Sequence, residues 1–294
     1  MKLQDRLDQF KVDGYTVFHG LHDEARMQAW RDSCWATSSA ITLPGAPPAV
    51  WLSSVLELNP ALCLPMAAHP QLRDFAEQVM GPFVQLDSLS FKVFPSLAPE
   101  AAQGKVNAWH RDRYAEIPQT RDYLRPWPCN TITYLQDLTA RSGPLRVIAG
   151  SHRDPVVFSA EARTQPHPRE TLIEARAGDV VLTHGLLAHS GTPNTSGQPR
   201  YFLSASYKRC WLRHRDNHAG PRVQAVVEDA RARNDRRLMR LLGHDDLLWE
   251  RSNPYFMSGD DEARWAAWIE EDRAALRGST AAPAPPATLS KLAP

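Results

Sequence analysis

The feature that most constrains the fold is a series of short β-prone runs in the middle of the chain. Clusters of Gly, Pro, Ser and Asn separate the runs, which do not alternate with helices in the manner of a parallel sheet. Many short strands of this kind are typical of an antiparallel sandwich or barrel. The runs cover residues 83–94, 131–138, 143–148, 171–174, 179–182 and 201–209.

Helical spacing of apolar residues flanks these strands on both sides. We expect helices at 3–10, 23–35, 70–80, 221–242 and 260–276, and a short strand at 14–18. Trp265 and Trp268 lie on one face of the last helix, which is more typical of core packing than of a ligand site. A proline-rich loop is expected at 42–50, and the Ala/Pro-rich residues 279–294 are expected to be mobile.

The composition is that of a folded globular protein. Of the 294 residues, 43% are apolar and 23% are charged, and the formal net charge of +1 is too small for a dedicated nucleic-acid binder. Charges run through the first residues, where a signal peptide would be apolar, and no run has the length of a membrane span. The four cysteines have neither metal-site nor disulfide spacing. We therefore expect one domain over 1–278, located in the cytosol, without nucleic-acid or membrane partners.

One short motif recurs. His-x-Asp occurs four times, where the composition predicts about one copy by chance, whereas the common nucleotide-binding, hydrolase and zinc-protease motifs are absent. In an extended segment, residues i and i+2 project to the same side, so an imidazole and a carboxylate can reach one ion. The motif is therefore a candidate part of a metal site.

The sequence around each copy indicates which of the four is a candidate metal site. His244-Asp-Asp246 follows a Leu-rich helix, and His152-Arg-Asp154 follows a turn and a strand, so we interpret both as structural. The segment His214-Arg-Asp-Asn-His218 places His214, Asp216 and His218 on one face if it is extended, and it stays an alternative metal site.

The remaining copy has a distant partner. His110 and Asp112 end a strand-and-loop region, and His189 lies where a buried strand runs into a Gly/Pro/Asn turn. Two histidines and one carboxylate with open positions form the facial triad of non-haem Fe(II) oxygenases. Arg200 follows eleven positions after His189 and opens an otherwise apolar strand, where a guanidinium could bind a carboxylate near the metal.

At these residues the chain resembles the phytanoyl-CoA dioxygenase (PhyH) family of Fe(II)/2-oxoglutarate oxygenases. Phe10-Lys-Val-Asp-Gly-Tyr-Thr-Val17 is similar to the family's N-terminal strand, and Trp109-His-Arg-Asp112 to its WHxD segment. Ser142-Gly-Pro-Leu-Arg-Val-Ile-Ala-Gly-Ser-His152 is similar to its GSH segment. The block from Gly178 to Arg200 resembles the family's distal-histidine region, and the similarity covers nearly the whole fold.

The resemblance implies a mainly β fold, the double-stranded β-helix or jelly roll, with its core at about 83–210 and helices on both sides. It assigns His110, Asp112 and His189 to iron and Arg200 to the far carboxylate of 2-oxoglutarate. Many members carry Ser or Thr two residues after the distal histidine, where this chain has Gly191. The residues proposed to replace that hydroxyl are Thr192, Ser88 and Ser90.

The implied activity is oxidative decarboxylation of 2-oxoglutarate with O₂, coupled to hydroxylation of an aliphatic C–H bond in a small molecule. Desaturation, epoxidation or rearrangement by the same chemistry is the first alternative. A non-catalytic jelly-roll binding protein is the second, and a zinc hydrolase is a third that leaves Arg200 without a role. The aromatic and charged residues 113–128 suit either a substrate lid or a solvated loop.

Overall fold

The computed structural model describes residues 1–41, 50–112, 121–252 and 261–279. The described residues form two compact units. The first comprises Met1–Ser53 and Ser90–Ala205, and the second comprises Ser54–Leu89 and the described residues of Ser206–Ser290. The single domain expected over 1–278 stays a prediction.

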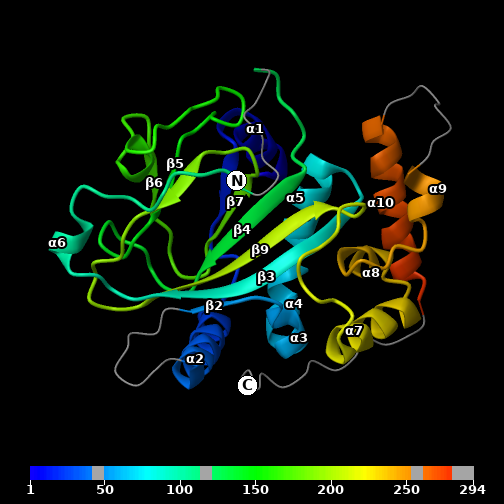
Figure 1. The fold of residues 1–294 in the computed structure, drawn as a ribbon. Coiled ribbons are helices and arrows are strands. Elements are labelled where there is room, and N and C mark those ends of the chain that lie inside the picture. The colour runs from blue at the N-terminus through cyan, green and yellow to red at the C-terminus, as the bar shows by residue number, and fades with distance from the viewer. Residues whose placement is uncertain (42–49, 113–120, 253–260, 280–294) are drawn as a thin grey trace. The chain divides into compact units, whose positions relative to one another are not determined.

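Two antiparallel sheets form the β structure of the described residues (Figure 1). The six-stranded sheet has the order β1 (Tyr15–Phe18), β7 (Val180–His184), β4 (Pro128–Tyr134), β9 (Arg200–Arg209), β3 (Val84–Phe94) and β2 (Val50–Leu52). The three-stranded sheet has the order β6 (Thr171–Ile173), β5 (Leu145–Val147) and β8 (His189–Gly191). Strands β3 and β9 each begin in one unit and end in the other.

The two sheets share one hydrophobic cluster in the first unit. It contains residues of the large sheet, such as Tyr134 and Val181, together with residues of the small sheet, such as Leu145, Val147 and Ile173. All five residues of β7 are buried, which explains its run of Val, Val and Leu between two neighbouring strands. One face of each sheet therefore packs against the other sheet, as in a jelly roll.

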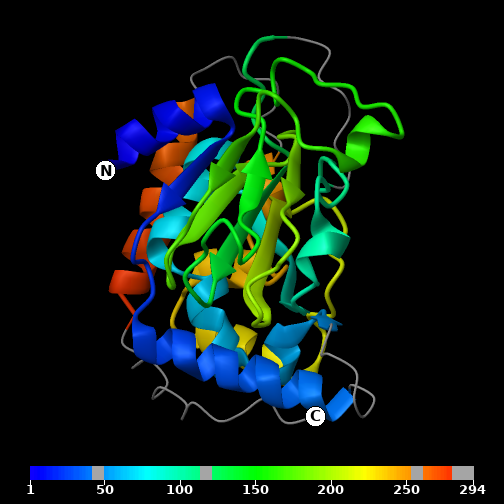
Figure 2. The ribbon, with the colours of Figure 1, turned by 90° about the vertical axis from the view of Figure 1, so that its left-hand side faces the viewer.

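Helices accompany the sheets of the first unit (Figure 2). They are α1 (Leu3–Asp13), α2 (Glu24–Ile41), the single turn α6 (Pro99–Ala102) and the 3-10 turn at Ala162–Thr164. Helix α1 ends at Gly14, whose φ of 81° is left-handed and whose N–H bonds to the carbonyl of Phe10 at 2.9 Å. That glycine turns the chain directly into β1.

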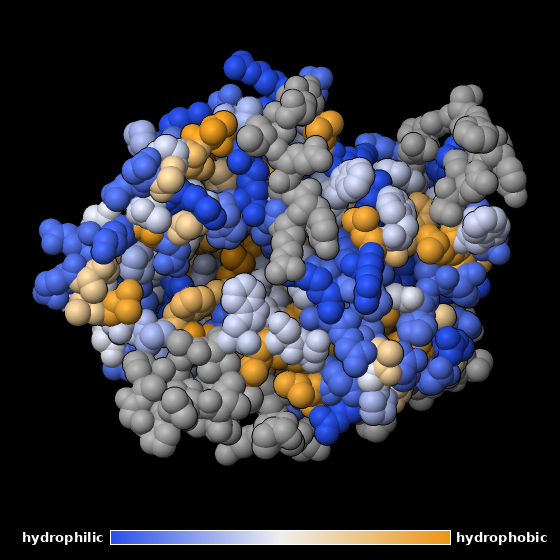
Figure 3. All heavy atoms as spheres, viewed as in Figure 1, coloured by the Kyte–Doolittle hydropathy of each residue, from blue (hydrophilic) through white to orange (hydrophobic). Residues whose placement is uncertain are grey.

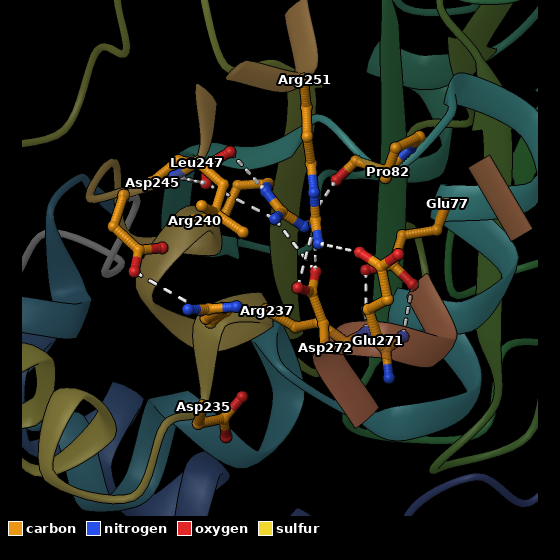
Figure 4. Close-up of polar contacts among 12 residues, drawn as sticks. Glu77, Pro82, Asp235, Arg237, Arg240, Asp245, Leu247, Arg251, Glu271 and Asp272 are labelled. Carbon is orange, nitrogen blue, oxygen red and sulfur yellow. Dashed lines mark hydrogen bonds and ion pairs between the residues drawn. The ribbon is translucent and has the colours of Figure 1, made fainter. Parts of the chain in front are cut away.

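The second unit is mainly helical. Its helices are α3 (Val55–Leu58), α4 (Pro60–Ala67), α5 (Pro70–Met80), α7 (Pro221–Ala232), α8 (Arg236–Leu241), α9 (Leu248–Ser252) and α10 (Asp261–Arg277). Buried ion pairs join α8, α9 and α10 (Figure 4). Asp272 accepts from both Arg240 (3.0 Å) and Arg251 (2.9 Å), and Arg240 also pairs with Asp245 at 2.6 Å. None of the described helices is both long and apolar enough to cross a membrane.

Several sequence expectations need correction. The helix expected at 221–242 is broken, because Asn234 has a left-handed φ of 54° and Asp235 caps α8 by accepting from the backbone N–H of Leu238. Strands β2 and β8 and the helices α3 and α4 were not predicted, since their runs are too short or too proline-rich for a periodic signal. The loop expected at 42–50 and the tail at 279–294 lie almost wholly outside the described residues.

Candidate active site

The two candidate histidines meet through a backbone bridge. The N–H of His110 bonds to the carbonyl of His189 at 3.0 Å, and the N–H of His189 returns to His110 at 2.9 Å. This pairing places the two imidazoles beside each other, with ring centroids 4.2 Å apart. Residues 79 positions apart in the sequence are thereby held in one place by main-chain bonds.

Packing on either side fixes the segment that carries His110. The indole of Trp109 stacks on Phe158, with ring centroids 5.6 Å apart, and its N–H donates to the carbonyl of Gln165. The guanidinium of Arg111 donates to the carbonyls of Leu186 and Val156. These contacts anchor the residues on both sides of His110, so its orientation does not depend on a ligand.

The Nδ1 atom of each imidazole is hydrogen-bonded to a main-chain carbonyl. Nδ1 of His110 lies 2.8 Å from the carbonyl of Ala108, and Nδ1 of His189 lies 3.0 Å from that of Leu187. Carbonyl acceptors favour the tautomer with a proton on Nδ1, which leaves Nε2 as a lone-pair donor. Desolvation, and next the neighbouring imidazole of His189, lower the pKa of His110, although part of its side chain is exposed. Burial also lowers the pKa of His189.

Asp112 is the third residue of the group, and its carboxylate lies slightly farther from His189 than two ligands of one ion would lie from each other. Its Oδ1 lies 3.8 Å from Nε2 of His189. Two ligand atoms held at right angles by one ion, each at roughly 2.1 Å, are about 3 Å apart. Accordingly, the described residues contain no three His, Cys, Asp or Glu side chains already gathered into a finished metal site. The donor set nevertheless fits ferrous iron, because it offers two imidazole nitrogens and a carboxylate within a small side-chain adjustment.

Arg200 lies deep in the first unit at the start of β9. It is only 4% exposed, and its guanidinium donates to the carbonyls of Gly143 and of Thr192, the latter at 3.1 Å. Its Nε has no hydrogen-bond partner, and no carboxylate pairs with it, among the described residues. Desolvation lowers the pKa of Arg200. A buried cation of this kind is costly unless an anion binds it.

Aromatic and cationic side chains around Arg200 were missed in the sequence. Phe94 and Phe202 stack with centroids 5.7 Å apart, and the Arg200 guanidinium lies 5.0 and 5.6 Å from their rings. The ammonium of Lys92 lies 5.5 Å from the Phe202 ring, and its charge acts on both His110 and His189. Strand alternation could have found them, because Lys92 and Phe94, like Arg200 and Phe202, are two residues apart.

Tyr134 of β4 is a further neighbour of Arg200 that the sequence did not single out. Its ring lies 5.9 Å from that of Phe202, and burial raises the pKa of its phenol to about 12. The nearby charge of Arg200 acts in the opposite direction.

The hydroxyl residues predicted to bind 2-oxoglutarate are dispersed. Thr192 lies beside Arg200, but its hydroxyl accepts from Arg146 at 2.9 Å while its carbonyl faces Arg200. Ser90 is buried on β3. Ser88 belongs to the second unit, where its hydroxyl accepts from Arg215 at 2.7 Å. Their binding roles stay predictions.

The other histidines have different surroundings. His152 and His184 are both buried with centroids 4.9 Å apart, and their Nε2 atoms meet the carbonyls of Lys11 and Leu124. In the second unit, His214 and His218 stack at 4.6 Å, but the carboxylate of Asp216 bonds to the backbone N–H of Leu89. Asp216 thus already has a main-chain partner, which disfavours the alternative metal site at His214, Asp216 and His218; as at His110, no finished metal site is gathered there in the described residues.

The surface near Thr192 is open. Residues including Lys105, Arg146, Thr192 and Thr195 line a hollow of about 400 Å³. Figure 3 shows the face on which β5 and β6 lie; it is hollowed near its middle, with hydrophobic residues at the floor and hydrophilic residues around them.

A jelly roll that brings two histidines and an aspartate together defines the class of 2-His-1-carboxylate proteins, to which the non-haem Fe(II) oxygenases belong. Comparison with protein-family models gives a match over residues 10–202 to the family described as phytanoyl-CoA dioxygenase (PhyH). The chain belongs to the phytanoyl-CoA dioxygenase family. This confirms the family that the sequence predicted.

Individual relatives are more distant. L-proline trans-4-hydroxylase of Streptomyces griseoviridis is 27% identical over 175 residues, which are 50% of this chain and 63% of that protein. The alignment thus spans less than two thirds of that relative.

Solved structures share the fold at low identity. HygX from Streptomyces hygroscopicus, solved with nickel and 2-oxoglutarate, has a TM-score of 0.60 and 15% identity, covering 72% of this chain and 88% of that one. The epimerase SnoN from nogalamycin biosynthesis has a TM-score of 0.54 and 19% identity, covering 71% and 81%. The expected jelly-roll fold is confirmed, as two antiparallel sheets with flanking helices.

Proposed function

We propose that the protein is an Fe(II)/2-oxoglutarate-dependent dioxygenase that hydroxylates an aliphatic C–H bond of a small molecule, releasing succinate and CO₂. In this proposal His110, Asp112 and His189 hold the iron, and Arg200 binds the far carboxylate of 2-oxoglutarate. Ser90, Thr192 and Ser88 are the candidate hydroxyl contacts of that cosubstrate. The whole protein's activity is a proposal, because the relative with a named reaction is matched over only part of its length.

The observation that carries the proposal is the buried, unneutralised charge of Arg200. Its guanidinium has only carbonyl partners among the described residues, although burial makes an isolated cation costly. A dicarboxylate with one end at Arg200 and the other near the histidines would neutralise that charge and form charge-assisted hydrogen bonds. A zinc hydrolase or a simple binding protein has no need of this arrangement.

The protein's own groups have defined tasks in this scheme. The carbonyls of Ala108 and Leu187 orient His110 and His189 so that Nε2 of each ring is available. Low pKa values keep both rings neutral, which is the state that binds a metal. Phe94 and Phe202 shield the Arg200 guanidinium from water, which strengthens its attraction for a carboxylate. Iron bound here would supply the activation of O₂ that couples decarboxylation of 2-oxoglutarate to oxidation of the substrate.

Hydroxylation is favoured as the outcome because the relative L-proline trans-4-hydroxylase is named for that reaction. The fold also occurs in SnoN, which is named an epimerase, so desaturation, epoxidation and rearrangement stay alternatives. A cytosolic location and a small-molecule substrate, as predicted from the sequence, belong to the same proposal.

The test is an aerobic assay with Fe(II), 2-oxoglutarate and a panel of small metabolites, followed by mass spectrometry. We expect succinate release that rises with one class of substrate, and a product that has gained one oxygen atom. A product that has only lost two hydrogen atoms would replace hydroxylation by desaturation. Absence of succinate with every substrate, in protein shown to be folded, would contradict the proposed function.

A further inference from the structure

An exposed tryptophan lies at the edge of the large sheet, on the strand paired with β3. Trp51 is the central residue of β2, at the edge of the large sheet, and is 65% exposed. Large apolar side chains at this level of exposure lose hydrophobic stabilisation and are frequent at binding sites. The site proposed above gives Trp51 no role.

One lysine contacts Trp51 and also acts electrostatically on the histidine pair. In the β2–β3 pairing Trp51 stands opposite Lys92, and the Lys92 ammonium lies 3.8 Å from the centroid of the indole. The same charge acts on His110 and His189. The exposed indole therefore contacts a lysine whose charge reaches both histidines proposed to hold iron.

The cation–π contact holds one face of the indole. An ammonium over an indole face is attracted by the ring quadrupole and restricts the ring's rotation. A ring so restricted presents its open surface with little further loss of conformational entropy on binding.

A ladder of side chains continues from Trp51 to Arg200. Lys92 lies between the rings of Trp51 and Phe202, and Phe202 stacks on Phe94 beneath the Arg200 guanidinium. All five side chains belong to the first unit and share one face of the sheet, since Lys92 pairs opposite Trp51 and contacts Phe202. The ladder runs from the proposed cosubstrate arginine at one end to the exposed indole at the other.

We propose that Trp51 is a substrate-stacking residue, and that the substrate carries a flat or apolar ring face with a neutral or anionic group beside it. This inference rests on the proposed function for the meaning of "substrate". The ring requirement follows from the open indole surface. The charge requirement follows from Lys92, because an ammonium already in contact with Trp51 repels a second cation placed against the same ring.

Three small probes separate the two requirements. Phenylacetate has a ring and a negative charge, 2-phenylethylammonium has the same ring and a positive charge, and hexanoate has the negative charge without a ring. Each is titrated into the protein loaded with Zn²⁺ and saturating 2-oxoglutarate, so that carboxylate probes do not compete at Arg200. In the unmodified protein, the indole N–H resonance of Trp51, identified by its loss in Trp51→Phe, reports whether a probe reaches the ring. The dissociation constants of the protein and its variants are measured by calorimetry.

We expect phenylacetate to bind at least about tenfold more tightly than either other probe, a ratio that matches the lower end of aromatic stacking energies. Trp51→Ala should remove this preference, and Trp51→Phe should restore part of it. Trp35→Ala is the matched control, because Trp35 is also exposed but contacts Tyr201, whose side chain lies on the opposite face of β9 from Phe202. That variant should bind phenylacetate like the unmodified protein.

The same experiment contains the results that would overturn the inference. Equal affinity for phenylacetate and hexanoate would remove the stacking role, and tighter binding of 2-phenylethylammonium would remove the charge requirement. An unchanged dissociation constant in Trp51→Ala would reject the residue itself. Failure of the proposed function is seen separately, as a loss of Zn²⁺ and 2-oxoglutarate binding before any probe is added.

Discussion

The burial of Arg200 is the basis of the chemistry proposed for this residue. Its burial makes the uncompensated charge unfavourable in the free protein, and this is what makes the residue a strong carboxylate receptor. The two histidines differ from it, since main-chain carbonyls already satisfy their Nδ1 atoms. The histidines and the arginine should therefore respond differently to substitution.

Removal of the Arg200 guanidinium tests its role directly. Arg200→Met should weaken 2-oxoglutarate binding by roughly 2–5 kcal/mol, the range for truncating one partner of a buried charged pair. Metal affinity should change little, and Arg200→Lys should restore only part of the loss, because an ammonium cannot form two parallel hydrogen bonds. Calorimetric titration of 2-oxoglutarate measures this, with the exposed Arg141→Met as control. Unchanged affinity in Arg200→Met would remove the residue from the site.

The buried pair His152 and His184 predicts a pH dependence of stability. Desolvation lowers the pKa of each to about 4 in the folded protein, from an ordinary value of 6.5. The unfolded chain therefore binds protons first as the pH falls through 6.5, and stability is lost progressively down to about pH 4. His184→Gln should flatten the fall in unfolding free energy between pH 7 and 5 by about 2 kcal/mol. Urea titrations at both pH values measure the slope, and an unchanged slope would contradict the assignment.

At the scale of elements, the chain's turns position the site. The turn before β5 carries Gly143, whose φ is 86°, and a Cβ built there would lie 2.2 Å from Nη1 of Arg200 and 2.7 Å from the carbonyl of Thr192. The glycine is thus required both by its backbone conformation and by the close approach of the guanidinium.

Gly143→Ala should therefore damage folding and cosubstrate binding together. Gly197→Ala is a matched control, because Gly197 has a φ of 85° but nothing within 4 Å of a built Cβ. Both variants should lose about 1 kcal/mol of stability from backbone strain, whereas only Gly143→Ala should weaken 2-oxoglutarate binding, by at least about tenfold or 1.4 kcal/mol. Equal cosubstrate affinity in the two variants would show that the turn does not position Arg200.

Elements with a strong local pattern were predictable from the sequence. The run 83–94 became β3 because β-prone residues extend over the whole element, and 70–80 became α5 because helical spacing does. Strand β8 was missed, although it carries His189, because three residues hold no periodicity and their pairing is fixed by distant Val147 and Leu145. The single helix expected at 221–242 was wrong because a backbone break at Asn234 leaves the apolar spacing almost unchanged.

The candidate site was predictable from the sequence only as far as residue types indicate a chemical role. His110 and Asp112 were singled out by a motif, and His189 by its context and the family resemblance. The structure joins the two histidines by a mutual backbone bridge, and the role of all three residues as iron ligands stays a prediction. Lys92 and Trp51 could not be found in this way, since their relation depends on the pairing of β2 with β3. Nor could the surroundings of Ser88 be predicted, because its hydroxyl accepts from Arg215, which is 127 residues away in the sequence.

At the scale of the whole molecule, the second unit contains a network of buried charged side chains. Asp272 is fully buried and forms ion pairs with both Arg240 and Arg251 (Figure 4). Buried ion pairs contribute little net stability when intact, but removing one partner leaves uncompensated charge behind.

Asp272→Ala should therefore lower the unfolding free energy by about 3–5 kcal/mol. The control is Glu270→Ala on the same helix, where an exposed carboxylate pairs with Arg277 and its removal should change stability little. Denaturant unfolding measures both. A loss of similar size in the two variants would show that the buried network is not what holds this unit.

The most direct test of the central claim is an anaerobic titration of Fe(II) and 2-oxoglutarate followed by visible absorption. The unmodified protein should develop the weak charge-transfer band of a chelated 2-oxoglutarate complex, since three protein ligands leave room for a bidentate oxoacid. His189→Ala should lack the band while remaining folded, and His214→Ala, at the alternative site, should keep it. A band that survives in His189→Ala, or disappears in His214→Ala, would contradict the account.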